Sequence, residues 1–254
     1  MDAKSRAIDL LLLVFQALDF LYFPGRTVFG RGGYRFSSLE MARSVHYLTR
    51  RGLVEKRRDA EGWVYALTAS GRQRLNRGID PVARWNRRWD GRWRQVIFDL
   101  PARKKALRAR LLRWLRANRF GYLQDSVWIT PDPLDLSHSA FRDLGMMADM
   151  AVFMDSRVTA VSSNASVVAA AWNFKEIEKA YARHAKFLDK ASIEVGIPKS
   201  PEALAQVLSE EDRLWWAALD TDPLLPKTLC LDAYPGVSAL NARKKFFRSL
   251  RKRA

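Results

Sequence analysis

Cysteine, histidine and long hydrophobic runs are all scarce in this sequence. The single cysteine, Cys230, excludes an intramolecular disulfide framework and a multi-cysteine zinc site. The three histidines, His46, His138 and His184, lack the spacing of metal ligands. The one long apolar run, residues 8–23, is interrupted by polar residues and is shorter than the about 20 residues that cross a bilayer. With no recognisable signal peptide, we expect a cytoplasmic protein without a membrane segment.

Catalytic motifs are equally scarce. The Gly-Arg-Gly-Gly run at residues 30–33 lacks the Gly-Lys-Ser/Thr ending of a phosphate-binding loop, so we interpret it as a turn. No Gly-x-Ser-x-Gly nucleophile motif occurs in the sequence. The sequence therefore predicts no catalytic residue and no cofactor.

Basic residues, in contrast, are abundant. Lysine and arginine number 44 against 27 acidic residues, which gives a formal net charge of +17 and a pI near 10.4. With 48% hydrophobic residues and nine tryptophans, the 254-residue chain has enough apolar surface to fold into about two domains. A folded protein with this excess of positive charge is expected to bind an acidic partner, and nucleic acid is the first choice.

The first 80 residues show the element order of a winged helix-turn-helix. A helix is expected over residues 5–23, ended by Pro24 and Gly25, and a second one begins at Ser37 or Ser38 and ends at Gly52. Two β-prone runs joined by a polar turn then form a hairpin, and a further helix opens after Thr68. In such modules the second helix enters the major groove of DNA, and the hairpin contacts neighbouring phosphates.

Basic and aromatic side chains gather on one face of the predicted second helix and on the hairpin. Helical spacing places Met41, Ala42, Val45 and Leu48 on the inner face. The candidate DNA-binding residues are Arg43, His46, Tyr47, Arg50, Arg51, Lys56, Arg57 and Arg58. For an isolated helix, a solvated basic face is the simpler interpretation. The adjoining hairpin and the overall charge favour DNA binding instead.

The middle of the chain, residues 92–160, has the order strand, helix, two strands, short helix, strand. The strands are expected at residues 94–100, 122–124, 126–130 and 150–154, with helices over 104–118 and from Ser137. This βαββαβ order is typical of a ferredoxin-like domain. Positions 91–130 carry ten lysines and arginines against two aspartates, so the first of these helices is strongly basic.

Several motifs resemble those of the PaaX-like regulators, the phenylacetic-acid catabolon repressor family. The central motifs are Trp89-Asp90-Gly91-Arg92-Trp93-Arg94, Val96-Ile97-Phe98-Asp99-Leu100-Pro101, Phe120-Gly121-Tyr122-Leu123, Ser126-Val127-Trp128-Ile129 and Pro131-Asp132-Pro133-Leu134. Later ones are Ala171-Trp172-Asn173-Phe174 with Tyr181, Asp222-Pro223-Leu224-Leu225-Pro226 and Tyr234-Pro235-Gly236. The likeness therefore covers essentially the whole chain.

This resemblance implies an α+β multidomain fold with an N-terminal winged helix, a central ferredoxin-like domain and a C-terminal helical domain. We expect their boundaries at residues 1–80, 81–162 and 163–254. It also implies a homodimeric transcriptional repressor that reads an inverted-repeat operator in double-stranded DNA and is released by an aryl acyl-CoA effector. An accessory nucleic-acid-binding protein without effector control is an alternative.

A second alternative is a metal-dependent nuclease. The central unit also resembles the small ferredoxin-like CRISPR-associated subunit of the spacer-integration complex, whose first strand ends in an aspartate linked to nuclease activity. Asp99 stands at the matching position. Magnesium needs further oxygen ligands, which a second copy of Asp99 in a dimer could supply. No second acidic motif accompanies Asp99, so a structural hydrogen bond is the favoured interpretation and no metal is predicted.

The last 90 residues are predicted to be helical. Asn173 to Glu176 has the chemistry of a capping box, and Pro201 is placed at the first position of another helix. Trp172, Trp215 and Trp216 are candidates for an apolar effector slot, although such clusters are more often core. A basic closing helix from about Val237 could contact phosphates, with a solvated terminus as the simpler interpretation.

Overall fold

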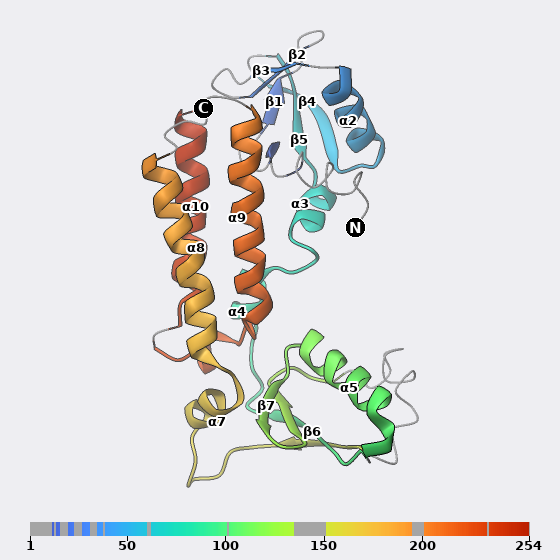
Figure 1. The fold of residues 1–254 in the computed structure, drawn as a ribbon, viewed down its shortest axis with the longest axis vertical. Coiled ribbons are helices and arrows are strands. Elements are labelled where there is room, and N and C mark those ends of the chain that lie inside the picture. Colours follow the sequence, from blue (N-terminus) through green and yellow to red (C-terminus); the bar gives the residue numbers. More distant parts are fainter. Residues whose placement is uncertain are drawn as a thin grey trace. The chain divides into compact units, whose positions relative to one another are not determined.

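The computed structural model describes residues 12, 14–15, 20–22, 27–30, 35–37, 39–59, 62–100, 102–134, 151–194, 201–232 and 234–253. The chain forms two compact units, both assembled from separate stretches of sequence. The first combines residues 1–80, 180–218 and 235–254, and the second combines residues 81–179 and 219–234. Figure 1 labels most of the elements of both units.

The first unit contains an antiparallel five-stranded sheet with the order β3-β2-β1-β5-β4. Its strands are β1 (Phe20–Tyr22), β2 (Thr27–Gly30), β3 (Arg35–Ser37), β4 (Val54–Asp59) and β5 (Gly62–Leu67). β1 lies in the centre, because Leu21 pairs with Gly30 of β2 and with Tyr65 of β5. The sheet therefore joins the N-terminal strands to the later β4–β5 hairpin.

The prediction of one continuous helix over residues 5–23 is wrong at its C-terminal end. Leu12, Val14 and Phe15 are helical, whereas Phe20–Tyr22 is strand β1. The apolar run satisfies helical periodicity, but its aromatic end pairs with two strands that are distant in sequence. Such non-local pairing overrides a local preference. The predicted turn at residues 31–33 lies outside the described residues.

Helix α2 (Leu39–Arg50) agrees closely with the predicted second helix, and its end has a specific cause. Gly52 adopts a φ of 67°, which is accessible to glycine without a steric penalty. This conformation lets the Gly52 N–H donate to the Thr49 carbonyl and the Leu53 N–H donate to the Leu48 carbonyl. These two bonds form a Schellman motif that fixes where the chain leaves α2 and enters β4.

The predicted hairpin and the helix after it are both present. β4 and β5 pair along their whole length, from Val54 opposite Leu67 to Asp59 opposite Gly62. Helix α3 (Ala69–Leu75) begins after Thr68, whose hydroxyl accepts a 3.0 Å hydrogen bond from the Gly71 N–H. This N-cap supplies one of the hydrogen bonds that the first turn of a helix cannot make internally.

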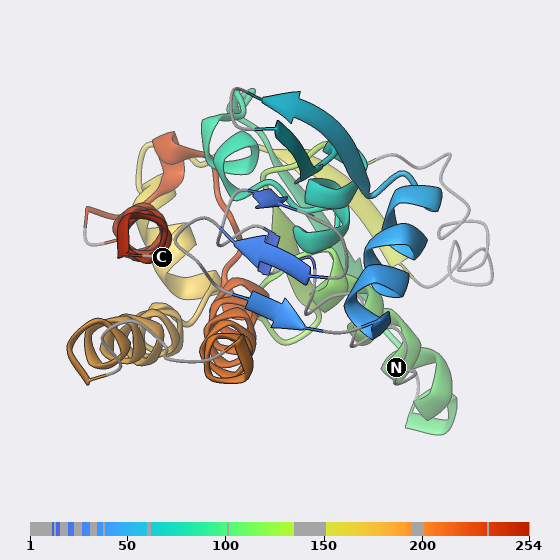
Figure 2. The same cartoon turned by 90° about the horizontal axis from the view of Figure 1, so that it is seen from above.

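Three long helices, α8 (Phe174–Glu194), α9 (Pro201–Thr221) and α10 (Gly236–Arg253), run side by side (Figure 1). Figure 2 views α9 and α10 nearly end-on. As predicted, Pro201 opens α9, and Asn173 caps α8 by accepting a 3.3 Å hydrogen bond from the Glu176 N–H. The helical character predicted for the last part of the chain is therefore confirmed for the described residues.

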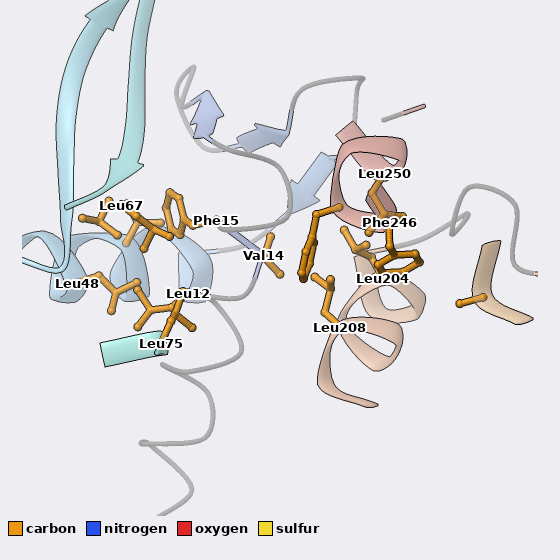
Figure 3. Packing of buried hydrophobic residues seen from close by; sticks show 14 of the residues in the cluster. Leu12, Val14, Phe15, Leu48, Leu67, Leu75, Leu204, Leu208, Phe246 and Leu250 are labelled. Carbon is orange, nitrogen blue, oxygen red and sulfur yellow. The ribbon is translucent and has the colours of Figure 1, made fainter. Parts of the chain in front are cut away.

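The core of the first unit joins these helices to the N-terminal elements. Leu12, Phe15 and Leu48 pack in one buried cluster with Leu208 of α9 and Phe246 of α10. Figure 3 shows 14 residues of this cluster, with Val14 between the N-terminal and C-terminal groups. Each fully buried leucine or phenylalanine contributes about 1.5–3 kcal/mol of transfer free energy. The described residues of the N-terminal segment thus pack with the C-terminal helices in one core.

The second unit contains an antiparallel four-stranded sheet with the order β7-β8-β6-β9. Its strands are β6 (Trp93–Phe98), β7 (Gly121–Gln124), β8 (Val127–Thr130) and β9 (Ala151–Ser156). Its helical elements are α4 (Pro81–Asn86), η1 (Ala102–Lys104), α5 (Lys105–Ala117), α7 (Asn164–Ala171) and η3 (Lys227–Leu229). Leu111 and Leu115 of α5 are buried against Val96 and Trp128 of the sheet. The predicted helix at Ser137 lies outside the described residues.

Gly121 in β7 allows the Trp172 ring to pack closely against the strand. A Cβ atom at this position would lie 2.6 Å from the Trp172 ring, closer than such contacts occur in proteins. Trp172 in turn lies beside Trp93, with ring centroids 6.1 Å apart. Any side chain at Gly121 would therefore displace the Trp172 ring and the end of α7.

A polar network explains several of the residues that carry the family resemblance. The carboxylate of Asp222 accepts hydrogen bonds from the Leu224 N–H, at 2.7 Å, and from the Tyr234 hydroxyl. The Trp85 indole donates to the Tyr234 oxygen at 2.7 Å, and Arg119 donates to the Leu219 carbonyl at 2.6 Å. These bonds tie residues 219–234 to the rest of the second unit, residues 81–179. A structural role thus accounts for this set of motif residues.

Candidate nucleic-acid interface

The outer face of α2 is basic, aromatic and exposed. Val45 and Leu48 are buried in the core of the first unit, as predicted, whereas the side chains of Met41 and Ala42 lie outside the described ones. On the opposite side, Tyr47 is 41% exposed and the Arg51 guanidinium lies 5.3 Å from its ring centroid. The exposed candidates on and just after this helix are Arg43, His46, Tyr47, Arg50 and Arg51.

The β4–β5 hairpin also carries exposed basic and aromatic side chains. Lys56, Arg57 and Arg58 are all exposed on β4. The Lys56 ammonium lies 4.8 Å from the ring centroid of Trp63, which is 54% exposed. A cation held over an exposed indole can meet phosphate oxygens while the ring contacts sugar or base. Six basic side chains therefore stand on α2, its end and β4.

The three tryptophans predicted for an effector slot are buried. Trp172 belongs to the second unit, where it packs against Gly121 and Trp93. Trp215 and Trp216 belong to the first unit and are 2% and 4% exposed. Each of the three thus has a packing role within its own unit.

Asp99 is exposed and follows the last residue of β6. Among the described residues, no group of three His, Cys, Asp or Glu side chains lies close enough together to hold a metal ion. A carboxylate alone supplies too few oxygen ligands for magnesium. The geometry in the described part of the chain gives the nuclease alternative no further support.

A buried ionic cluster that the sequence did not predict lies in the three-helix part of the first unit. Glu211 of α9 is fully buried, and its carboxylate accepts hydrogen bonds from Arg243 of α10 at 2.7 and 2.9 Å. His184 of α8 is also fully buried and lies 2.8 Å from the same carboxylate through Nε2. One ionisable side chain from each helix thus meets in the core. The available signal was that each interrupts an apolar stripe at helical spacing.

Electrostatics in this cluster favour an ionised Glu211. Burial raises the pKa of its carboxyl group, but the charge of Arg243 and the hydrogen bonds from His184 and Arg243 outweigh burial and lower the pKa overall. The Arg243 guanidinium also lies 4.9 Å from the Trp215 ring centroid. Glu211 and Arg243 therefore form a charge-assisted hydrogen-bonded pair next to the Trp215 ring.

The pKa of Asp212, the next residue along α9, is shifted in the opposite direction to that of Glu211. Burial, together with the charge of neighbouring Glu211, raises the pKa of its carboxyl group to about 6, although Arg243 and Arg77 oppose the shift. Its Oδ1 accepts a 3.0 Å hydrogen bond from the Trp216 indole. The folded state therefore holds a proton on Asp212 at a pH at which an unfolded aspartate is ionised.

This raised pKa predicts a specific pH dependence of stability. Between about pH 4 and pH 6 the folded state binds more protons at Asp212 than the unfolded state, so this contribution to stability is present at low pH and is lost as the pH rises through 6. A shift of this size corresponds to at most about 3 kcal/mol. Denaturant unfolding from pH 4 to pH 7 should show a weaker fall in stability for Asp212→Asn than for the wild type. The exposed control Asp189→Asn should follow the wild type, and identical curves for all three proteins would contradict the assignment.

In the described part of the chain, no helix is both long enough and apolar enough to cross a membrane.

The two units together define a multidomain α+β protein with two small sheets. Residues 86–168 match the family model described as the PaaX protein central Cas2-like domain. This match supports a PaaX-like family assignment for the chain, and the assignment suggests a transcriptional regulator.

A solved structure has a similar fold. The uncharacterized protein Rv0674 from Mycobacterium tuberculosis matches with a TM-score of 0.51 and 22% sequence identity, over 86% of this chain and 83% of that chain. At this identity the likeness concerns the fold alone. No curated protein matches the chain in sequence.

Proposed function

We propose that the protein is a DNA-binding transcriptional repressor that acts as a homodimer on an inverted-repeat operator. The observation that carries the proposal is that exposed basic residues stand both on α2 and on β4 of the hairpin that follows it directly. The match of residues 86–168 to the central domain of PaaX proteins, a family that is generally regulatory rather than catalytic, supports the same conclusion. A cytoplasmic location belongs to this proposal, because the operator DNA is found there.

The finer fold assignment is part of the proposal. The strand order β1-β5-β4, with α2 placed directly before the β4–β5 hairpin, supports a winged helix in the first 80 residues. The order β7-β8-β6-β9, with α5 between β6 and β7, supports a ferredoxin-like central domain. The division at residues 80 and 162 follows from these two assignments.

In this mechanism α2 reads bases and the hairpin positions the protein. Arg43, Tyr47 and Arg50 stand on the outer face of α2, where side chains can reach base edges in the major groove. Arg57 and Arg58 on β4 contact phosphates, which fixes the register of α2 on the duplex without reading sequence. Release by an aryl acyl-CoA is carried only by the family resemblance, because the buried positions of Trp172, Trp215 and Trp216 give it no further support.

Selection of binding sites from random duplex DNA tests the proposal. Two reader helices in a two-fold dimer should enrich an inverted repeat whose half-sites are about 10–10.5 base pairs apart, or a multiple of that distance. Sedimentation of the protein with the selected duplex should give two chains per site. Enrichment of single half-sites by a monomer would contradict the dimer, and a pool without any enriched sequence would contradict specific DNA binding.

A further inference from the structure

A pocket of about 430 Å³ lies between α5 and the β7–β8 hairpin of the second unit. This volume is within the usual range of small-molecule sites, about 300–1,000 Å³. Its walls combine two guanidinium groups and two aromatic rings with a carboxylate and a hydroxyl group. The lining residues are Arg108, Leu112, Arg116, Tyr122, Asp125, Ser126 and Trp128. The DNA-binding proposal uses none of them.

The fold itself brings these residues together. Arg108, Leu112 and Arg116 are four residues apart along α5, so they form one stripe on the helix. Tyr122 of β7 pairs directly with Trp128 of β8, which places both rings on the same face of the sheet. The ring centroids are 5.4 Å apart at an interplanar angle of 66°. Because β7 is an edge strand, the pocket lies at the margin of the sheet.

The positive charges of the pocket are available to a ligand. The Arg116 guanidinium lies 5.9 Å from the Trp128 ring centroid, and that of Arg108 lies 5.8 Å from the Phe98 ring centroid. Both arginines are exposed, and neither is ion-paired with a carboxylate of the described residues. Two guanidinium groups next to aromatic rings are a suitable site for a phosphate attached to a planar group.

The polar atoms beside the rings restrict the ligand further. Trp128 is 5% exposed, and its indole N–H is buried without a hydrogen-bond partner in the described part of the chain. Buried donors of this kind normally have a partner. Asp125, in contrast, offers carboxylate oxygens at the turn of the hairpin, which accept hydrogen bonds and repel a second carboxylate.

We infer that this pocket binds a nucleotide. The phosphate lies between Arg108 and Arg116, and the base lies against Tyr122 and Trp128. An acceptor atom of the base accepts a hydrogen bond from the indole N–H of Trp128, while an N–H group of the base donates a hydrogen bond to Asp125. An aromatic carboxylate could pair with the two arginines and stack on the two rings, but it has no N–H group to donate to Asp125. The same chemistry is present in a free mononucleotide and in one nucleotide of a single strand.

Titration calorimetry with GMP as the probe tests the inference. Guanine carries a carbonyl acceptor and N–H donors. Arg116→Gln or Arg108→Gln should weaken GMP binding about tenfold or more, since each removes a charged hydrogen bond. Arg113→Gln, an exposed arginine of the same helix outside the pocket, is the matched control and should leave binding unchanged. Trp128→Phe, which keeps an aromatic ring but removes the five-membered ring that carries the indole N–H, should also weaken the binding of GMP.

Further probes separate the alternatives. Benzoate and inorganic phosphate should bind more weakly than GMP, and Asp125→Asn should weaken GMP without changing the binding of phosphate. A short single-stranded oligonucleotide that binds more tightly than GMP, and remains sensitive to Arg116→Gln, identifies a strand as the source of the nucleotide. Tighter binding of GMP than of the oligonucleotide identifies the free nucleotide as the ligand.

The inference is overturned if neither probe binds, if Arg113→Gln has the same effect as Arg116→Gln, or if benzoate binds as tightly as GMP. Duplex binding is not measured here, so failure leaves the repressor proposal unaffected.

Discussion

Replacement of Glu211 by alanine is expected to lower the free energy of unfolding by about 3–5 kcal/mol. The change leaves the Arg243 guanidinium, whose side chain is only 9% exposed, without its buried carboxylate partner. It also removes the hydrogen-bond partner of His184 Nε2. An unpaired buried charge is among the few single-site defects with an effect of this size.

Glu210, the neighbouring residue, provides a matched control. Its carboxylate also pairs with an arginine, Arg213, at 2.6 Å, but the two side chains are 42% and 63% exposed. Exposed pairs of this kind contribute about 0–1 kcal/mol, so Glu210→Ala should change stability little. Denaturant unfolding of both variants makes the comparison. Equal losses would contradict a special role for the buried cluster.

A second experiment covers the case in which Glu211→Ala does not fold. The double substitution Glu211→Leu with Arg243→Met removes both charges and fills the space with apolar atoms. It should be more stable than either single change, because buried ion pairs replaced by apolar residues of similar volume are often neutral in stability. Additive losses in this cycle would mean that the two side chains act independently.

Duplex DNA binding should depend steeply on salt, and the hairpin should carry part of this dependence. Each phosphate neutralised by a lysine or arginine contributes about −0.9 to the slope of log K against log salt. Arg57→Ala and Arg58→Ala should each flatten the slope by about that amount and lower affinity about tenfold, for all sequences alike. Fluorescence anisotropy with a labelled duplex at a series of salt concentrations measures both effects.

The exposed arginine Arg183 of α8 supplies the control for the hairpin variants. Arg183→Ala removes the same charge from a helix outside the proposed interface, so it should leave the slope almost unchanged. If it flattened the slope as much as Arg57→Ala does, net charge rather than the hairpin would explain binding.

Local signals in the sequence predicted the elements of the candidate interface well. Gly52, Thr68 and Asn173 mark helix ends through their own backbone or side-chain hydrogen bonds, and the structure contains each of these caps. The β4–β5 hairpin follows from two β-prone runs and a short turn, which are likewise neighbours in sequence. Burial of Val45 and Leu48 follows from helical periodicity alone.

Non-local pairing explains what the sequence could not predict. Phe20–Tyr22 is strand β1 because it pairs with residues more than 40 positions away in β5. His184, Glu211 and Arg243 meet only because α8, α9 and α10 pack together, and the apolar stripe around each one does not say which side chain it pairs with. The pocket beside Trp128 likewise requires the register of β7 on β8. None of these contacts has a signature within a single sequence window.

The sequence preference of reader-helix variants tests the central claim most directly. Affinities of the wild type, Arg43→Ala, Tyr47→Ala and Arg50→Ala are measured for the selected site and for sites with single base-pair changes. A contact to a base edge is worth about 1–3 kcal/mol of discrimination, so each variant that loses one should lose its preference at one position of each half-site, while Arg57→Ala keeps every preference. Unchanged preference in all three α2 variants would show that α2 does not read the DNA sequence.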